Sequence, residues 1–196
     1  MQSLLRRAYS ILPGLRGSSH NAEERTAPMG DLMSDLKRHS DDLIKQRRLP
    51  VVCYALALHA GVAAKTISPG AEAKMMDAAR NGYSPEYLKL MGITVNNDSA
   101  TFSAEQISES GILNFKETER GVVMHTAYLH KDAQGGLTLV HNNCSPLDKA
   151  MVDAGSMPTQ LNGLLVYTGT TGLQNYLNTG YSFHFTPAGH LNRQAG

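Results

Sequence analysis

The chain has 196 residues, a net charge of +1, 41% hydrophobic residues and 18% charged residues. This composition is typical of one globular domain and argues against a disordered chain. The small net charge argues against recruitment to nucleic acid or to a membrane surface, and no apolar run approaches the roughly 20 residues of a membrane span. The two cysteines, Cys53 and Cys144, are too few for a disulfide framework, so we expect two thiols.

Residues 1–28 are predicted to form a flexible leader, followed by one domain over residues 29–196. The leader carries Arg6, Arg7 and Arg16 and has no acidic residue before Glu23. It lacks the layout of a cleaved secretory signal. It resembles an organelle transit peptide or the leader of a secreted bacterial effector, and the simplest interpretation is a loose tail.

Two helices are predicted first. Apolar residues close to a 3.6-residue period indicate an amphipathic helix that begins near Gly30 and ends before Pro50. The next helix, from about Cys53 to Ala64, is apolar nearly all round. A helix of that kind is buried on most of its sides.

Three shorter helices are predicted from their capping residues. The stretches SPGAEAKMMDAARNG (68–82) and SPEYLKLMG (84–92) each begin with a Ser cap and a first-turn Pro, and each ends at a Gly. SAEQ (103–106) has the pattern of a capping box and predicts a short helix that ends by Gly111.

The second half of the chain changes to strand patterns. Residues 120–143 contain two β-rich runs joined by KDAQGG, which predicts a hairpin. LLVYTG (164–169) and YSFHFTP (181–187) predict two more strands, with a short helix, TGLQNYLN (171–178), between them. Helices followed by an antiparallel sheet indicate an α+β domain.

Cys53 is the first residue to suggest chemistry, because a helix N-terminus stabilises a thiolate. A thiol nucleophile also needs a base, and the base needs an orienting partner. If His130 pairs with Leu137 across the turn, the register places His125 opposite Asn142, within reach of its amide. His130 would then face the other side of the strand.

The turn leaves this register open to one alternative. A bulge at Gly135 or Gly136 would shift the pairing by one residue and assign the orienting role to Asn143. His141 would then share the face of that residue.

A Cys that opens a buried helix, a His on a strand and an Asn after the next strand resemble the papain-like cysteine peptidases, in layout the small bacterial effector peptidases and deamidases of the YopT type. The resemblance implies Cys53 as nucleophile, His125 as general base and Asn142 as its orienting partner. Gln46 lies seven residues before Cys53, whereas papain-like enzymes place an oxyanion-hole Gln six before it. The implied activity is hydrolysis of an amide bond in a protein substrate, such as a host protein, by a secreted effector without a cofactor.

Two alternatives remain at this point. The chain is then either a non-catalytic interaction protein of the same fold with an inert, buried Cys53, or a zinc protein. The zinc alternative rests on His125, His130, His141 and Cys144, which lie close in sequence. A pocket open above Cys53, with His125 within hydrogen-bond reach, would distinguish the enzyme.

Overall fold

A computed structural model describes residues 29–196 except 51 and 81, so the predicted leader, 1–28, lies outside the described residues. The chain forms an α+β domain whose first part is helical and whose second part builds a sheet. The helices are α1 (Met29–Lys45), α2 (Cys53–Ala63), α3 (Pro69–Ala78), α4 (Pro85–Leu90), the 3-10 helix η1 (Ala104–Gln106), α5 (Ser145–Asp153), α6 (Leu173–Leu177) and α7 (Ala188–Gln194). The strands are β1 (Gly111–Glu117), β2 (Val122–Lys131), β3 (Leu137–His141), β4 (Thr159–Leu161), β5 (Leu164–Thr168) and β6 (Tyr181–Pro187).

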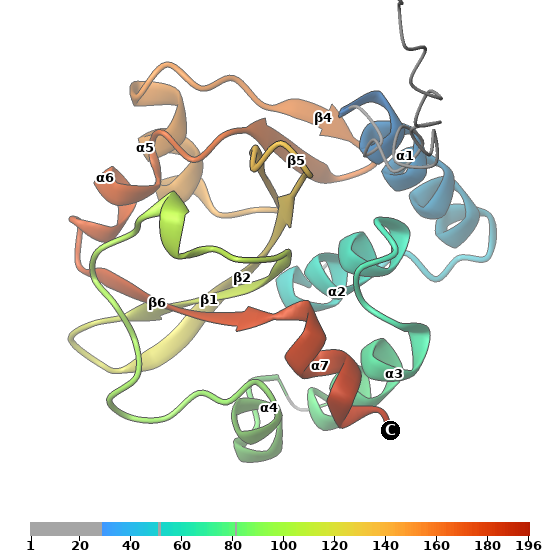
Figure 1. The fold of residues 1–196 in the computed structure, drawn as a ribbon, viewed down its shortest axis with the longest axis horizontal. Helices are drawn as coiled ribbons and strands as arrows, with labels where there is room; N and C mark the ends of the chain where they lie inside the picture. The colour runs from blue at the N-terminus through green and yellow to red at the C-terminus, as the bar shows by residue number, and fades with distance from the viewer. Residues whose placement is uncertain (1–28, 51, 81) are drawn as a thin grey trace, which may run out of the picture.

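The sheet has the strand order β4-β5-β3-β2-β1-β6, and all its pairings are antiparallel. Helices cover both of its faces: α2, α3 and α7 lie together on one side, and α5 and α6 lie on the other (Figure 1). Because successive side chains of a strand project to opposite faces, each central strand contributes to two separate cores.

The two cores divide the sheet residues by parity. The first core joins Ile112, Tyr128, Val140 and Val166 to apolar side chains of α1, α2, α3, α4 and α7. The second core joins Leu113, Phe115, Ala127, Leu129, Leu139 and Tyr167 to apolar side chains of α5 and α6. We call these two sides the α2 face and the α5 face.

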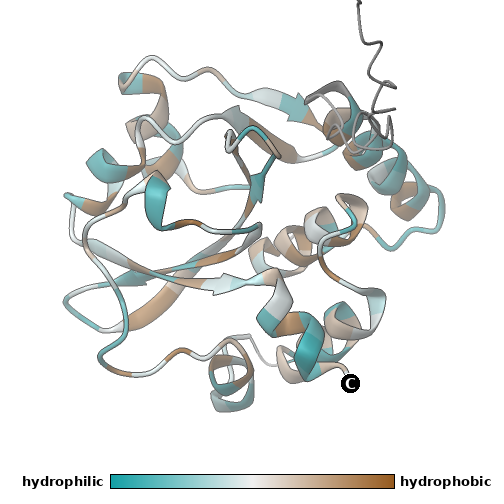
Figure 2. Cartoon of the chain, viewed as in Figure 1, coloured by the Kyte–Doolittle hydropathy of each residue, from teal (hydrophilic) through white to brown (hydrophobic). Residues whose placement is uncertain are grey.

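The buried helix is confirmed. The seven residues of α2 that are buried include Leu56 and Leu58, and the helix has no polar face in Figure 2. It packs mainly against β2, which is an inner strand of the sheet. The helix therefore lies over the inner part of the sheet.

Two of the predicted caps are confirmed and one is wrong. The Ser68 hydroxyl accepts the Ala71 N–H at 3.1 Å, and the Ser84 hydroxyl accepts the Tyr87 N–H at 3.0 Å. Ser103 makes no side-chain cap, and only a three-residue 3-10 helix follows it. One short turn leaves few orphan N–H groups for a capping box to satisfy.

The predicted hairpin is confirmed, the preferred register is wrong by one residue, and the pairing found is that of the alternative, shifted by one. His130 pairs with Thr138, and Lys131 pairs with Leu137. The loop therefore holds five residues, Asp132–Gly136, where the predicted pairing needed six. It closes through the Asp132 carboxylate, which accepts the Gly136 N–H at 2.7 Å.

Several elements were not predicted. They are the strands β1 and β4 and the helices α5 and α7. Six of the seven residues of β1 are buried, because α helices cover both faces of this inner strand. A strand buried on both faces lacks the alternation of apolar and polar residues by which strands are recognised.

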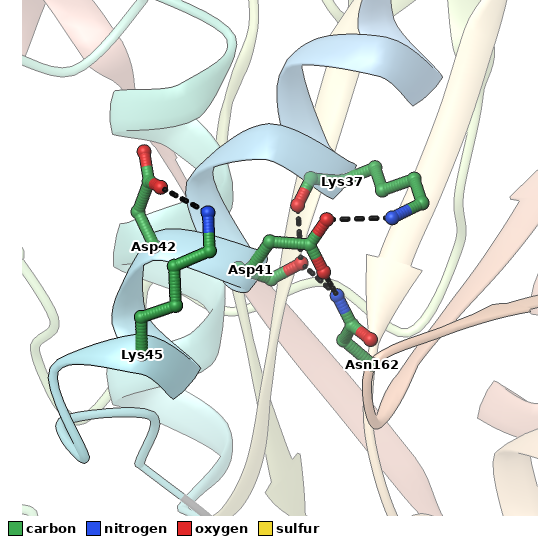
Figure 3. Close-up of polar contacts among 6 residues, drawn as sticks. Lys37, Asp41, Asp42, Lys45 and Asn162 are labelled. Atoms are coloured by element: carbon green, nitrogen blue, oxygen red, sulfur yellow. Dashed lines mark hydrogen bonds and ion pairs between the residues drawn. The ribbon is translucent and has the colours of Figure 1, made fainter.

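α1 is attached to the sheet through Asn162, which lies in the turn between β4 and β5. Its side-chain amide donates to Ser40 Oγ at 2.7 Å and to Asp41 Oδ1 at 2.8 Å (Figure 3). Lys37 also binds Asp41 from the preceding turn of α1. The α1 helix is thus held to the edge of the sheet by polar as well as apolar contacts.

No helix among residues 29–50, 52–80 and 82–196 combines the length and the apolar character needed to cross a membrane.

Candidate functional site

Cys53 is the first residue of α2, as expected. The backbone of the preceding Val52 is extended and provides no side-chain cap. Cys53 is half-buried and, like Cys144, a free thiol. A half-buried thiol at the start of a buried helix is the part of the predicted site that the structure contains.

The Cys53 thiol belongs to a chain of polar side chains on the α2 face. Its Sγ lies 3.1 Å from the Tyr83 hydroxyl, which lies 2.8 Å from Thr126 Oγ1. Thr126 donates to Asn114 Oδ1 at 2.9 Å, and Tyr87 donates to the same oxygen at 3.0 Å. We call these five residues the thiol network.

The direction of each hydrogen bond follows from the number of protons available. A hydroxyl has one proton, and Thr126 uses its proton on Asn114 Oδ1. The Tyr83 hydroxyl must then donate to Thr126, so it can only accept from Cys53. The Cys53 S–H is therefore the first donor of a chain that ends on an amide oxygen.

Burial supports this direction. Burial raises the pKa of Tyr83, and the nearby Cys53 raises it further. Burial also raises the pKa of Tyr87. Both phenols therefore stay protonated. Neither can act as a base toward the thiol at neutral pH.

The structure does not bring His125 to Cys53. His125 follows the parity of Ala127 and Leu129 and projects to the α5 face, where its ring stacks on Phe115 with 12° between the planes. The neighbouring Thr126 projects to the α2 face and is part of the thiol network. It therefore occupies the place near Cys53 where the predicted triad requires a base. The sheet itself thus separates the predicted nucleophile from the predicted base.

His125 instead belongs to a second polar chain. Its Nε2 lies 3.1 Å from Nδ1 of His141, whose Nε2 lies 3.2 Å from Asp148 Oδ1. Tyr167 donates to the same carboxylate oxygen at 2.7 Å. The carboxylate favours a proton on His141 Nε2, which leaves His141 Nδ1 to accept from His125 Nε2–H.

The electrostatics of this second chain keep His125 neutral. Burial, followed by the adjacent His141, lowers the pKa of His125 to about 3, although Asp148 acts in the opposite direction. Burial acts to raise the pKa of Asp148, but hydrogen bonds from His141 and Tyr167 outweigh it, and the pKa is lowered. His125 is therefore a neutral imidazole, and Asp148 is an ionised carboxylate.

The remaining residues of the predicted site are Asn142, its alternative Asn143, and Gln46. Asn142 is 2% exposed and directly follows β3, and the residue before it, His141, lies 3.1 Å from Nε2 of His125 through its Nδ1. Asn143 has a left-handed backbone with φ 43°. Gln46 is exposed after α1, where its side-chain oxygen accepts from Arg48.

The residues of the zinc alternative are divided. His130 binds the Tyr128 hydroxyl at 3.0 Å on the α2 face, whereas His125 and His141 lie on the α5 face. Cys144 is 3.9 Å from Tyr176, and burial raises its thiol pKa. Within the part of the chain that the structure describes, no three His, Cys, Asp or Glu side chains are placed to hold a metal ion.

A pocket adjoins the thiol network. It has a volume of about 330 Å³ and has Tyr83 in its wall. The other walls come from α4 and the segment after it, and from the adjoining ends of β1 and β2. Pockets of this size and partly apolar lining bind small ligands or side chains of a partner.

Most of the thiol network was not predicted from the sequence. Tyr83 and Tyr87 flank the start of α4, four residues apart, and Asn114 lies among the apolar residues Ile112, Leu113 and Phe115 of β1. A polar residue within a buried strand is a detectable signal, because burial requires that it has a partner. Its partners, 27 and 12 residues away in the chain, were not identifiable from spacing.

Comparison with known protein families finds one family model that matches the chain. A family model described as "Domain of unknown function (DUF8038)" matches residues 34–195, from the first turns of α1 to the end of α7. The chain belongs to this family. Neither the curated proteins nor the solved structures with which it was compared include a match. The family description states no activity, so a function must be argued from the site.

Proposed function

We propose that this chain is a non-catalytic, polypeptide-binding protein of papain-like layout, with its recognition surface at the Cys53 end of the sheet. The direction of the thiol network carries the proposal. A catalytic thiol needs a base that accepts its proton. Here the acceptor is the Tyr83 hydroxyl, whose own proton is committed to Thr126.

Exposed apolar side chains at this end support binding. Val95 is 86% exposed and Val122 is 45% exposed, and both line the pocket. Val52, 42% exposed, directly precedes Cys53, and Met124, 47% exposed, lies two residues before Thr126. Cys53 and Thr126 are joined through Tyr83 in the thiol network. Single exposed apolar residues are common, but a group around a pocket marks an interaction site.

Mass spectrometry of a peptide library incubated with wild type and with Cys53→Ala tests the proposal. We expect the peptide library to be the same after incubation with either protein, with no cleavage or deamidation that depends on the Cys53 thiol. Peptides selected for binding should bind wild type and Cys53→Ala equally. Products that form only with wild type would overturn the proposal.

The alternative candidate is a papain-like cysteine hydrolase that uses Cys53 and His125. One observation favours it: β2 carries one extra residue, Met124, opposite the step from Phe115 to Lys116 of β1. If this bulge moved past His125, the imidazole would turn to the α2 face. In that case His125→Ala would abolish turnover while the fold stays intact, and His130→Ala would not.

A further inference from the structure

The pocket beside Tyr83 combines apolar walls with one buried cation. Five of its nine lining residues are aliphatic: Leu88, Ile93, Val95, Val122 and Val123. Lys116 also lines the pocket, and its side chain is only 6% exposed. A buried ammonium in an apolar wall is costly unless its donors are satisfied.

Asp98 satisfies one of those donors. Lys116 Nζ lies 2.9 Å from Asp98 Oδ1, and Ser182 donates to the other carboxylate oxygen. Burial acts to raise the pKa of Asp98, but the hydrogen bonds from Lys116 and Ser182 outweigh it and lower the pKa. The Asp98 carboxylate is therefore ionised and offsets the charge of the Lys116 ammonium.

Two donors of the ammonium remain. An ammonium has three N–H groups, and Asp98 is the one hydrogen-bond partner that the described residues supply to it. Buried donors are normally paired with protein, water or ligand. Lys116 lines the pocket, so a ligand oxygen bound in the pocket can approach this side chain.

We infer that this pocket binds an apolar side chain of a partner polypeptide, with the adjoining backbone carbonyl accepting from Lys116; this rests on the proposed polypeptide-binding function. The apolar walls select an aliphatic side chain of about the size of leucine. A carbonyl oxygen supplies the missing acceptor and brings no charge. A ligand carboxylate would add a second negative charge beside Asp98, so charge complementarity favours the neutral group.

Three probes test the ligand chemistry on the full-length chain by amide chemical shifts in NMR titrations. They are N-acetylleucine N-methylamide, N-acetylleucine with its free carboxylate, and sodium octanoate. We expect the blocked leucine to shift signals around Val95, Lys116 and Val122, and the two carboxylates to bind more weakly. Tighter binding of octanoate would overturn the inference in favour of a lipid-like anion.

Two matched variants locate the site. Val95→Arg should weaken binding of the blocked leucine about tenfold or more, because it places a charged side chain at the mouth of the pocket. Met157→Arg changes another exposed apolar residue, 75% exposed and outside the pocket, and should leave binding unchanged. Equal binding by wild type and Val95→Arg would overturn the site. Neither variant touches the core, so both should fold.

The two proposals can fail separately. Peptide products that depend on Cys53 would overturn the non-catalytic function while leaving the ligand chemistry of the pocket intact. Absence of binding by the blocked leucine, with no such products, would overturn the ligand inference alone. Lys116→Met adds a test of the carbonyl contact: binding should weaken, and Val95→Arg decides the case if this variant does not fold.

Discussion

At the scale of single residues, adjacent positions of one strand serve two different chemical environments. Thr126 accepts from the Tyr83 phenol on the α2 face, and His125 donates to His141 on the α5 face. Both are almost fully buried, at 0% and 4% exposure. A strand that is covered on both faces can hold two polar chains that do not contact each other through side chains.

The His125 site predicts a specific dependence of stability on pH. The folded protein protonates His125 near pH 3, whereas the unfolded chain does so near its ordinary pKa of 6.5. Stability should therefore fall as the pH drops through this window, by about 1.4 kcal/mol per unit from this group, and should not change above it. His125→Phe should flatten that part of the curve. Urea unfolding of both proteins at several values between pH 7 and pH 4 measures the difference.

The pH range separates this effect from that of Asp148. The lowered pKa of Asp148 contributes stability that is present above its ordinary pKa and is lost only below it, as the carboxylate protonates. Of these two groups, the His125 imidazole is therefore the one that changes between about pH 6.5 and pH 4, and because burial also lowers the pKa of His39 and His130, the effect of His125 is the difference between wild type and His125→Phe. Parallel curves for wild type and His125→Phe would show that His125 is not buried as a neutral ring.

At the scale of secondary structure, the turn between β4 and β5 has two tasks. Asn162 and Gly163 form its two residues, with φ 49° and 85°, between the paired Leu161 and Leu164. Positive φ at both positions is the requirement of a type I′ hairpin turn, which Asn-Gly satisfies well. The Asn162 side chain also binds α1, so one residue links a sheet edge to a helix.

Two substitutions separate these tasks. Asn162→Gly removes the bonds to α1 but keeps the left-handed backbone, whereas Asn162→Ala removes both. We expect Asn162→Ala to be less stable than Asn162→Gly by about 1 kcal/mol, because alanine is strained in that conformation. Urea unfolding measures this difference, and faster amide exchange in α1 should appear in both variants. Equal stabilities would mean that the turn conformation contributes nothing.

At the scale of the whole molecule, the α5 face depends on close packing between α5 and α6. A Cβ at Gly172 would lie 2.4 Å from Met151 Cα and 2.5 Å from Ala150 O. Both atoms belong to the backbone of α5 and cannot rotate away. The absence of a side chain at Gly172 lets the two helices share one side of the sheet.

Gly172→Ala should therefore destabilise the protein by about 1–3 kcal/mol through overpacking. Gly70→Ala is the control, because a Cβ there would meet only Ala195 Cβ at 3.6 Å and the residue lies in α3. It should be neutral or stabilise by up to about 1 kcal/mol. Thermal or urea unfolding compares the two, and a neutral Gly172→Ala would contradict the proposed packing.

Local chemistry made part of this protein predictable from its sequence. Serine caps followed by proline determine where α3 and α4 begin, and unbroken apolarity determines that α2 is buried with Cys53 at its start. The hairpin of β2 and β3 follows from its glycine-containing turn. These features depend on neighbours within a few residues, which the sequence displays directly.

Only the tertiary structure decided what surrounds Cys53. Side chains alternate along a strand, so a loop of five residues rather than six changes the register by one, and the parity of β2 places Thr126, not His125, on the face of α2. Tyr83 reaches the thiol from 30 residues away because the helix that follows it, α4, belongs to the same core as α2. Spacing in the sequence contains no record of such contacts, since they arise from the packing of whole elements.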